Sequence, residues 1–176
     1  MKPTLPSILD VTSAIYIRDA QPADQPTIAQ FNQWLAGESE GKQLDPAILS
    51  QGVQRALQSP LLCRYFVAEL GGEIVGQTMI TFELTDWRNG VLWWIQSVYV
   101  REDCRAKGVF RALFTHIEAL ARQSSDVRGL RLYVEHGNHR AQEVYQRLGL
   151  KPGGYQVYEL DWSGAVGELD ANSSES

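Results

Sequence analysis

The sequence changes its hydrophobic period between residues 95 and 122, and this change constrains the fold more than any other feature. Residues 95–100 (IQSVYV) are rich in β-branched and aromatic side chains, which indicates a strand buried on both faces. From Val109 onward the apolar residues recur about every 3.6 positions, which predicts an amphipathic helix. The chain therefore passes from a central strand, through a short basic turn ending at Gly108, into a helix.

The predicted helix start near Gly108 is suited to binding a phosphate or pyrophosphate. The first N–H groups of a helix lack intrahelical partners, and the helix dipole is positive at that end. Arg105, Lys107 and Arg111 add cations around those donors. An ordinary strand–helix connection with solvated basic residues is an alternative of equal weight. The glycine spacing matches neither the phosphate-loop motif nor the dinucleotide fingerprint, which argues against an NTP or NAD phosphate.

A second pattern of spaced residues lies in the C-terminal part of the chain. Its members are Asn138, Ala141, Tyr145, Gly149 and Leu150. Asn138 stands between a predicted strand and a predicted helix, so it is equally suited to cap the helix and to hold a ligand. From the sequence alone, Tyr145 is more typical of a core aromatic than of a catalytic residue.

Together the two patterns resemble the GNAT superfamily of acetyl-CoA-dependent N-acyltransferases. The acyl-CoA motif of that family has Arg or Gln, two residues, Gly, one residue, and then Gly or Ala, between a central strand and a helix. Here the motif runs through Arg105, Ala106, Lys107, Gly108 and Val109, and Phe110 replaces its final small residue. The pattern that begins at Asn138 matches the second family signature more closely.

The resemblance implies that acetyl-CoA is the cosubstrate and that it binds along the central strand and the basic turn. The backbone of Val98 and Val100 would pair with the pantetheine arm as an added strand does. Asn138 would also hold this arm. The diphosphate would be bound by the turn and the start of the helix, at Arg105, Ala106, Lys107, Gly108, Val109, Phe110 (through its backbone N–H) and Arg111.

The resemblance also gives Tyr145 the role of general acid. Acetyl transfer to an amine expels a thiolate, whose thiol has a pKa of about 8.5, and a phenol of pKa about 10 can donate a proton to it. The general base is less clear, because Gln96 and Ser97 stand where many relatives carry a carboxylate. Glu83 and Asp86 are the candidates, and both are more typical of solvated surface acids. We select Glu83.

The acceptor pocket has no recognisable motif. In this family it is built from the variable helical region and the loop ends, here residues 31–45 and 84–91, and the substrate-binding candidates are Trp34, Glu38, Glu40 and Gln96. We expect transfer to a primary amine, on a small molecule rather than a protein. An acyl-CoA sensor with little turnover is the alternative, because of Gln96 and Phe110. A nucleotide-binding α/β protein of another family is a third.

Composition limits the remaining choices. With 44% hydrophobic and 21% charged residues the chain is typical of a soluble globular protein, and its net charge of −5 argues against nucleic acid as a partner. No run approaches the roughly 20 apolar residues of a membrane span. Cys63 and Cys104 are widely separated, which suits a cytoplasmic protein. His136 and His139 have no partners at metal spacing, so we expect no metal site.

The order of predicted elements is β-α-α-β-β-β-α-β-α-β, and it matches the GNAT acyl-CoA N-acyltransferase fold. This is an α/β fold of layered α+β type, with a mixed, mostly antiparallel, twisted sheet flanked by helices. The domain is expected at residues 14–162, between a loose arm at 1–13 and an acidic, disordered tail at 163–176. Its last strand is predicted at 155–160 (YQVYEL). Homodimers are common in the family, so the resemblance leaves a homodimer open.

Overall fold

The structure, a computed structural model, describes residues 14–162. These residues form two compact units, the first ending at His136 and the second beginning at Gly137. The arm predicted at residues 1–13 and the tail predicted at residues 163–176 lie outside the described residues. Within the described part of the chain, no helix is both long and apolar enough to cross a membrane.

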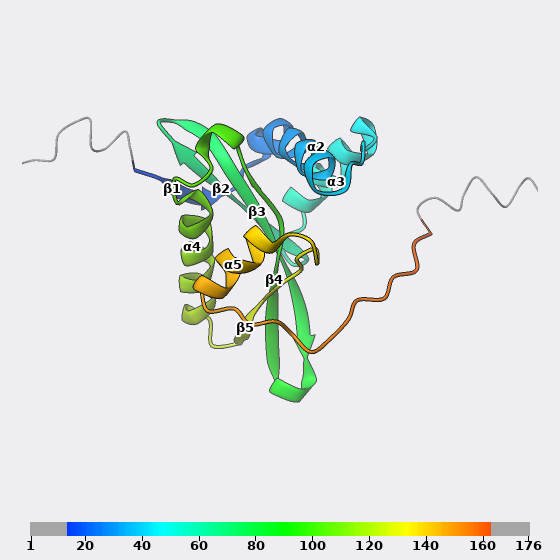
Figure 1. The fold of residues 1–176 in the computed structure, drawn as a ribbon, viewed down its shortest axis with the longest axis vertical. Coiled ribbons are helices and arrows are strands. Elements are labelled where there is room, and N and C mark those ends of the chain that lie inside the picture. The colour runs from blue at the N-terminus through cyan, green and yellow to red at the C-terminus, as the bar shows by residue number, and fades with distance from the viewer. Residues whose placement is uncertain (1–13, 163–176) are drawn as a thin grey trace, which may run out of the picture. The chain divides into compact units, whose positions relative to one another are not determined.

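The first unit is built on a five-stranded sheet with the strand order β1-β2-β3-β4-β5 (Figure 1). The strands are β1 (Tyr16–Asp19), β2 (Cys63–Leu70), β3 (Glu73–Thr85), β4 (Gly90–Val100) and β5 (Val127–Leu132). Neighbouring strands from β1 to β4 are antiparallel, and β5 pairs with β4 in parallel. This confirms the mixed, mostly antiparallel sheet. β5 begins at Val127, where its pairing with Val91 of β4 begins.

The helices of the first unit begin and end where local sequence signals predict. They are α2 (Gln25–Glu40), α3 (Pro46–Leu57) and α4 (Val109–Gln123). Asp45 caps α3 by accepting hydrogen bonds from the N–H groups of Ala47 and Ile48. Gly41 ends α2 with a left-handed φ of 65°. The predicted first helix starts as a 3-10 turn at Pro22–Asp24, which leads directly into α2.

The sheet carries helices on both faces. Successive side chains of a strand point to opposite faces, so Tyr65 and Val67 of β2 face α2 and α3 and belong to the apolar cluster on that side. Phe66, between them, faces α4 and contacts the ring of His116 edge-on, with 5.4 Å between ring centroids. Gly76 of β3 also faces α4. The sheet is therefore the middle of three layers.

The second unit contains α5 (His139–Arg147), as predicted, followed by residues without regular structure. The prediction of a strand at residues 155–160 is wrong, because these residues form no strand. Tyr155 and Tyr158 are 83% and 89% exposed there. Their alternating apolar pattern suits an extended chain, but a strand also needs hydrogen bonds from a neighbouring strand, and the pattern does not supply that neighbour.

An ion-pair cluster joins the first strand to the start of the helical layer. The guanidinium of Arg18 in β1 contacts the carboxylate of Asp24 at 2.6 Å and that of Glu69 in β2 at 2.7 Å. Asp24 is 7% exposed and also accepts the backbone N–H of Gln21 at 2.7 Å. The hydrogen bond from Arg18 holds the pKa of Asp24 below its ordinary value.

We expect Asp24→Asn to lower the free energy of unfolding by about 1.5–3 kcal/mol at pH 7, the range for hydrogen bonds to charged groups. A lowered carboxyl pKa stabilises the folded state above the unfolded-state pKa of about 3.9, and this contribution is lost as the pH falls through the folded-state value. Denaturant titrations of the parent and the variant at pH 7 and below pH 3 measure this difference in the free energy of unfolding. Equal differences between variant and parent at both pH values would contradict the ionic role.

Candidate functional site

A β-bulge interrupts β4 at the middle of the sheet. Gln77 of β3 lies opposite Tyr99, whereas Met79 lies opposite Gln96, so β4 has one extra residue between these two pairs. Ser97, within the bulge, has a φ of 50°, which is unusual for a residue with a side chain. The bulge bends the strand at the point where the sequence predicts ligand binding.

Beyond the bulge, β4 has an open edge. Its pairing with β5 ends at Ile95 and Leu132, whereas its pairing with β3 continues to Val100. Among the described residues, the backbone of residues 96–100 therefore has no strand partner on the β5 side. This stretch contains Val98 and Val100, the residues expected to pair with a pantetheine arm.

The turn between β4 and α4 has a backbone suited to an anion. Ala106 and Gly108 both adopt left-handed conformations, with φ of 61° and 86°. Gly108 is the N-cap of α4 and, as a glycine, makes no side-chain capping hydrogen bond. The positive end of the helix dipole is therefore left for a ligand. Lys107 and Arg111 are exposed beside it.

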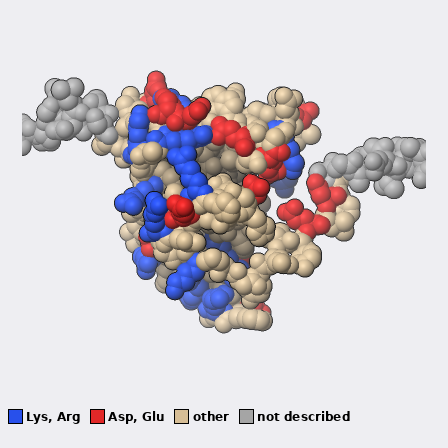
Figure 2. Space-filling view, viewed as in Figure 1, with Lys and Arg blue, Asp and Glu red and all other residues tan. Residues whose placement is uncertain are grey.

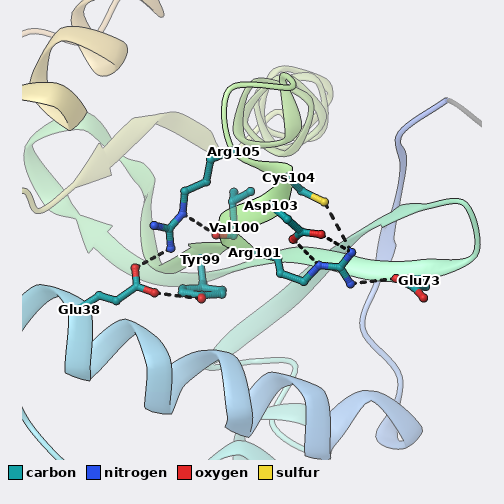
Figure 3. Close-up of polar contacts among 8 residues, drawn as sticks. All are labelled: Glu38, Glu73, Tyr99, Val100, Arg101, Asp103, Cys104 and Arg105. Atoms are coloured by element: carbon teal, nitrogen blue, oxygen red, sulfur yellow. Dashed lines mark hydrogen bonds and ion pairs between the residues drawn. The ribbon is translucent and has the colours of Figure 1, made fainter.

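Arg105 is held by neighbouring residues of the first unit (Figure 3). Its guanidinium contacts the carboxylate of Glu38 at 2.5 Å, and its Nε donates to the carbonyl of Val100 at 2.9 Å. It also lies over the ring of Tyr99, 5.6 Å from the centroid. Arg105 thus hydrogen-bonds a backbone carbonyl at the open edge of β4 and links this strand to α2.

Other ion pairs fix the rest of this turn. Arg101 contacts Asp103 at 2.7 Å and Glu73 at 2.9 Å, and its guanidinium also donates to the Sγ of the buried Cys104 (Figure 3). Figure 2 shows acidic side chains beside the basic ones at the top of the view, over this end of α4. The cations near the turn are therefore interspersed with carboxylates and do not form a bare basic patch.

The structure places the predicted acceptor residues of α2 in two different environments. Trp34 is 43% exposed and lies against Tyr99, with 5.9 Å between ring centroids. Glu38 accepts the Tyr99 hydroxyl at 3.1 Å, and burial, followed by this hydrogen bond, raises the pKa of Tyr99. Trp34 and Glu38 thus lie together beside β4. Glu40 instead forms an exposed ion pair with Lys42 at 2.6 Å.

Glu83 and Gln96 lie on the same sheet face as α2, and both are engaged by neighbours. Glu83 accepts a hydrogen bond from the indole Nε1 of Trp94 and pairs with Arg131 at 3.1 Å. The Gln96 amide donates to the hydroxyl of Thr81 at 2.7 Å. Among the described residues, no three His, Cys, Asp or Glu side chains gather as a metal site would require.

The profile of the Acetyltransferase (GNAT) family matches residues 28–150, most of the chain. The chain belongs to the GNAT acetyltransferase family. This confirms the resemblance found in the two motifs. The protein is therefore an acyltransferase of a family that uses acetyl-CoA. No functionally curated protein matches the sequence.

Solved structures of GNAT proteins resemble the fold. A possible acetyltransferase from Clostridium difficile 630 is 41% identical, with a TM-score of 0.78 over 84% of this chain and 97% of its own. Two more distant structures are 17% identical and show the fold alone. They are a ribosomal-protein-alanine N-acetyltransferase from Brucella melitensis biovar Abortus 2308 (TM-score 0.69, 84% and 99% covered) and a predicted acetyltransferase from Clostridium acetobutylicum with acetyl-CoA (TM-score 0.68, 85% and 97% covered).

The residues of this GNAT protein fit acetyl-CoA at two places. The open edge of β4 at residues 96–100 offers backbone groups to the amides of a pantetheine arm, as a strand edge does for an added strand. The uncapped start of α4, after a turn with two left-handed residues, suits a diphosphate. Gly108 is required there by its conformation, because a side chain at φ 86° would be strained.

The second unit carries the other two predicted site residues. Asn138 caps α5, and its Oδ1 accepts the backbone N–H of Ala141 at 3.1 Å, so the capping role predicted from the sequence is confirmed. Its pantetheine role stays a prediction. Tyr145 is partly buried, and burial raises the pKa of its phenol. The hydroxyl thus keeps its proton at neutral pH.

Sequence reasoning missed three residues that the structure places beside predicted ones. Tyr99 bonds Glu38, Arg131 pairs with Glu83, and Tyr133 stacks on Trp94. The alternation in LRLYVE places Arg131 and Tyr133 on one face of a strand, but only the pairing of β5 with β4 brings that face beside Trp94.

We expect Glu38→Gln to strengthen CoA binding by up to about fivefold. In the parent protein Arg105 is paired with Glu38, and an exposed ion pair contributes up to about 1 kcal/mol. Removing the carboxylate frees Arg105 for the diphosphate. Isothermal titration with CoA measures the change, and Glu40→Gln, from the neighbouring ion pair with Lys42, is the matched control. Weaker binding by Glu38→Gln would show that Glu38 supports the site.

Proposed function

We propose that this GNAT protein transfers an acetyl group from acetyl-CoA directly to the primary amine of a small molecule. The observation that carries the proposal is the open edge of β4 beside the uncapped start of α4. The two features adjoin along the chain, since only the turn from Arg101 to Gly108 separates them. A ligand with an amide-containing arm and a diphosphate matches both.

The residues of the turn and strand have binding roles in this proposal. Acetyl-CoA supplies the acetyl group as a thioester. The backbone groups of Val98 and the N–H of Val100, whose carbonyl accepts from Arg105, pair with the arm. The N–H groups at the start of α4 bind the diphosphate. The exposed side chains of Lys107 and Arg111 add positive charge beside the diphosphate. Arg105 leaves its ion pair with the Glu38 carboxylate and binds the diphosphate instead.

Tyr145 is the proposed general acid. Its Oη donates a proton to the departing sulfur, whose thiol has an ordinary pKa of about 8.5. The pKa of Tyr145 is raised by burial, which keeps this proton in place through neutral pH. The role is supported by the match of residues 138–150 to the family signature.

Glu83 is the proposed base, acting directly or through water. Trp94 and Arg131 hold its carboxylate in a fixed position. The demand on a base depends on the acceptor: a lysine-like amine of pKa about 10.4 costs roughly 4.6 kcal/mol to deprotonate at pH 7, whereas an amine of pKa about 7.8 costs about 1 kcal/mol. A single carboxylate held in this way suits an amine at the lower end of that range.

The decisive test is release of free thiol from acetyl-CoA over a panel of amino acids, polyamines, aminoglycosides and peptides. We expect turnover that depends on a small amine, with acetylated amine confirmed by mass spectrometry. Saturable acetyl-CoA binding without turnover on any member would favour an acyl-CoA sensor instead. Tighter binding of ATP or NAD than of CoA would overturn both.

Tyr145→Phe should lower kcat by about a hundredfold, the scale of general acid catalysis, and leave the Kd of acetyl-CoA within about twofold. Because the protonated phenol is the active form and its pKa is raised, any alkaline loss of kcat in the parent falls above about pH 10, and the variant lacks it. Tyr155→Phe, at an exposed position of the same unit, is the control. An unchanged kcat would remove Tyr145 from the mechanism.

A further inference from the structure

Four side chains form a compact cluster on the sheet face that also carries α2. The rings of Trp94 and Tyr133 stack, with 4.3 Å between centroids and 24° between planes. The guanidinium of Arg131 lies 5.5 Å from the centroid of Trp94 and pairs with Glu83 at 3.1 Å. Glu83 also accepts the indole N–H of Trp94. One carboxylate, one guanidinium and two aromatic rings thus share one surface.

Strand pairing places this cluster where β4 and β5 separate. Trp94 pairs with Arg131, and the last pair of the two strands, Ile95 with Leu132, comes directly after them. Tyr133 is the first residue beyond the pairing. The cluster therefore borders the open edge of residues 96–100. It lies at the N-terminal end of this edge, and the anion-binding turn follows the C-terminal end.

That location is the expected place for the acceptor. If the diphosphate binds at the start of α4 and the arm runs back along β4, the reactive end of the ligand reaches the region where the two strands part. The cluster is open to solvent there: Tyr133 is 55% exposed, and the side chains of Glu83 and Arg131 are 39% and 31% exposed.

We propose that this cluster, Glu83, Trp94, Arg131 and Tyr133, is the acceptor subsite and that it selects an amine which also carries a carboxylate, as an amino acid does. This inference rests on the proposed function. Glu83 receives the ammonium and Arg131 the carboxylate, so a zwitterion replaces the internal ion pair with two new ones. The stacked rings contact its apolar or aromatic side chain.

The charges of the cluster disfavour other acceptors. Polyamines and aminoglycosides carry several cations, and Arg131 would lie against one of them without a second acid in the cluster to balance it. An amine lacking a carboxylate would have to separate Glu83 from Arg131 and leave the guanidinium without its partner. Both costs are avoided by a ligand with one charge of each sign.

The test compares matched acceptors, phenylalanine with phenethylamine and lysine with cadaverine, which differ only in the carboxylate. We expect kcat/KM to favour the amino acid of each pair by at least tenfold. Arg131→Gln should reduce this preference by at least tenfold, and Arg131→Lys, which keeps the charge, should restore part of it. Arg122→Gln, in an exposed ion pair with Glu118 on α4, is the control.

Two outcomes would overturn the inference and leave the proposed function intact: turnover that favours the amines without a carboxylate, or an Arg131→Gln variant that lowers both members of a pair equally. The second would show that Arg131 acts only by holding Glu83. If no amine is turned over, the binding of the same amines to the protein tests the subsite. Tryptophan fluorescence should then show phenylalanine binding that Arg131→Gln abolishes, and equal binding of phenethylamine would refute the subsite.

Discussion

The separation of β4 from β5 is the constraint on which the rest of the site depends. It begins at the bulge around Ser97, and a polar network lies beside the bulge. The Tyr65 hydroxyl accepts from Asn32 at 3.1 Å, Asn32 accepts from the amide of Gln77 at 2.7 Å, and Gln77 pairs with Tyr99, which follows the bulge. Gln77 is fully buried, and its amide Nε2 donates this bond to Asn32. A regular strand would pair on both edges and offer no backbone groups to a ligand.

In the proposed function, the bulge lets one strand contribute to two binding sites. On its edge, residues 96–100 present backbone groups suited to an amide-containing arm. On its α2-facing surface, side chains before the bulge contact the Glu83 cluster, whereas Tyr99 beyond it contacts α2 and Glu38. Arg105 links the two regions through Glu38 and the Val100 carbonyl.

The motifs and the order of elements could be read from the sequence. The shift from a period of two to a period of 3.6 around Gly108 and the Asn138 cap are local properties, and the structure contains both. The strand predicted at residues 155–160 failed, because alternation describes one strand and says nothing of a partner.

What the sequence alone determined is therefore the family, the sheet with its flanking helices and the turn that suits a diphosphate. Only the tertiary structure decided which charges meet. Glu38 is 67 residues from Arg105 and Glu83 is 48 residues from Arg131, and both pairs exist because α2 and β5 pack or pair against β4. Local patterns carry no information about such contacts, since side-chain partners distant in sequence are set by strand register and helix packing.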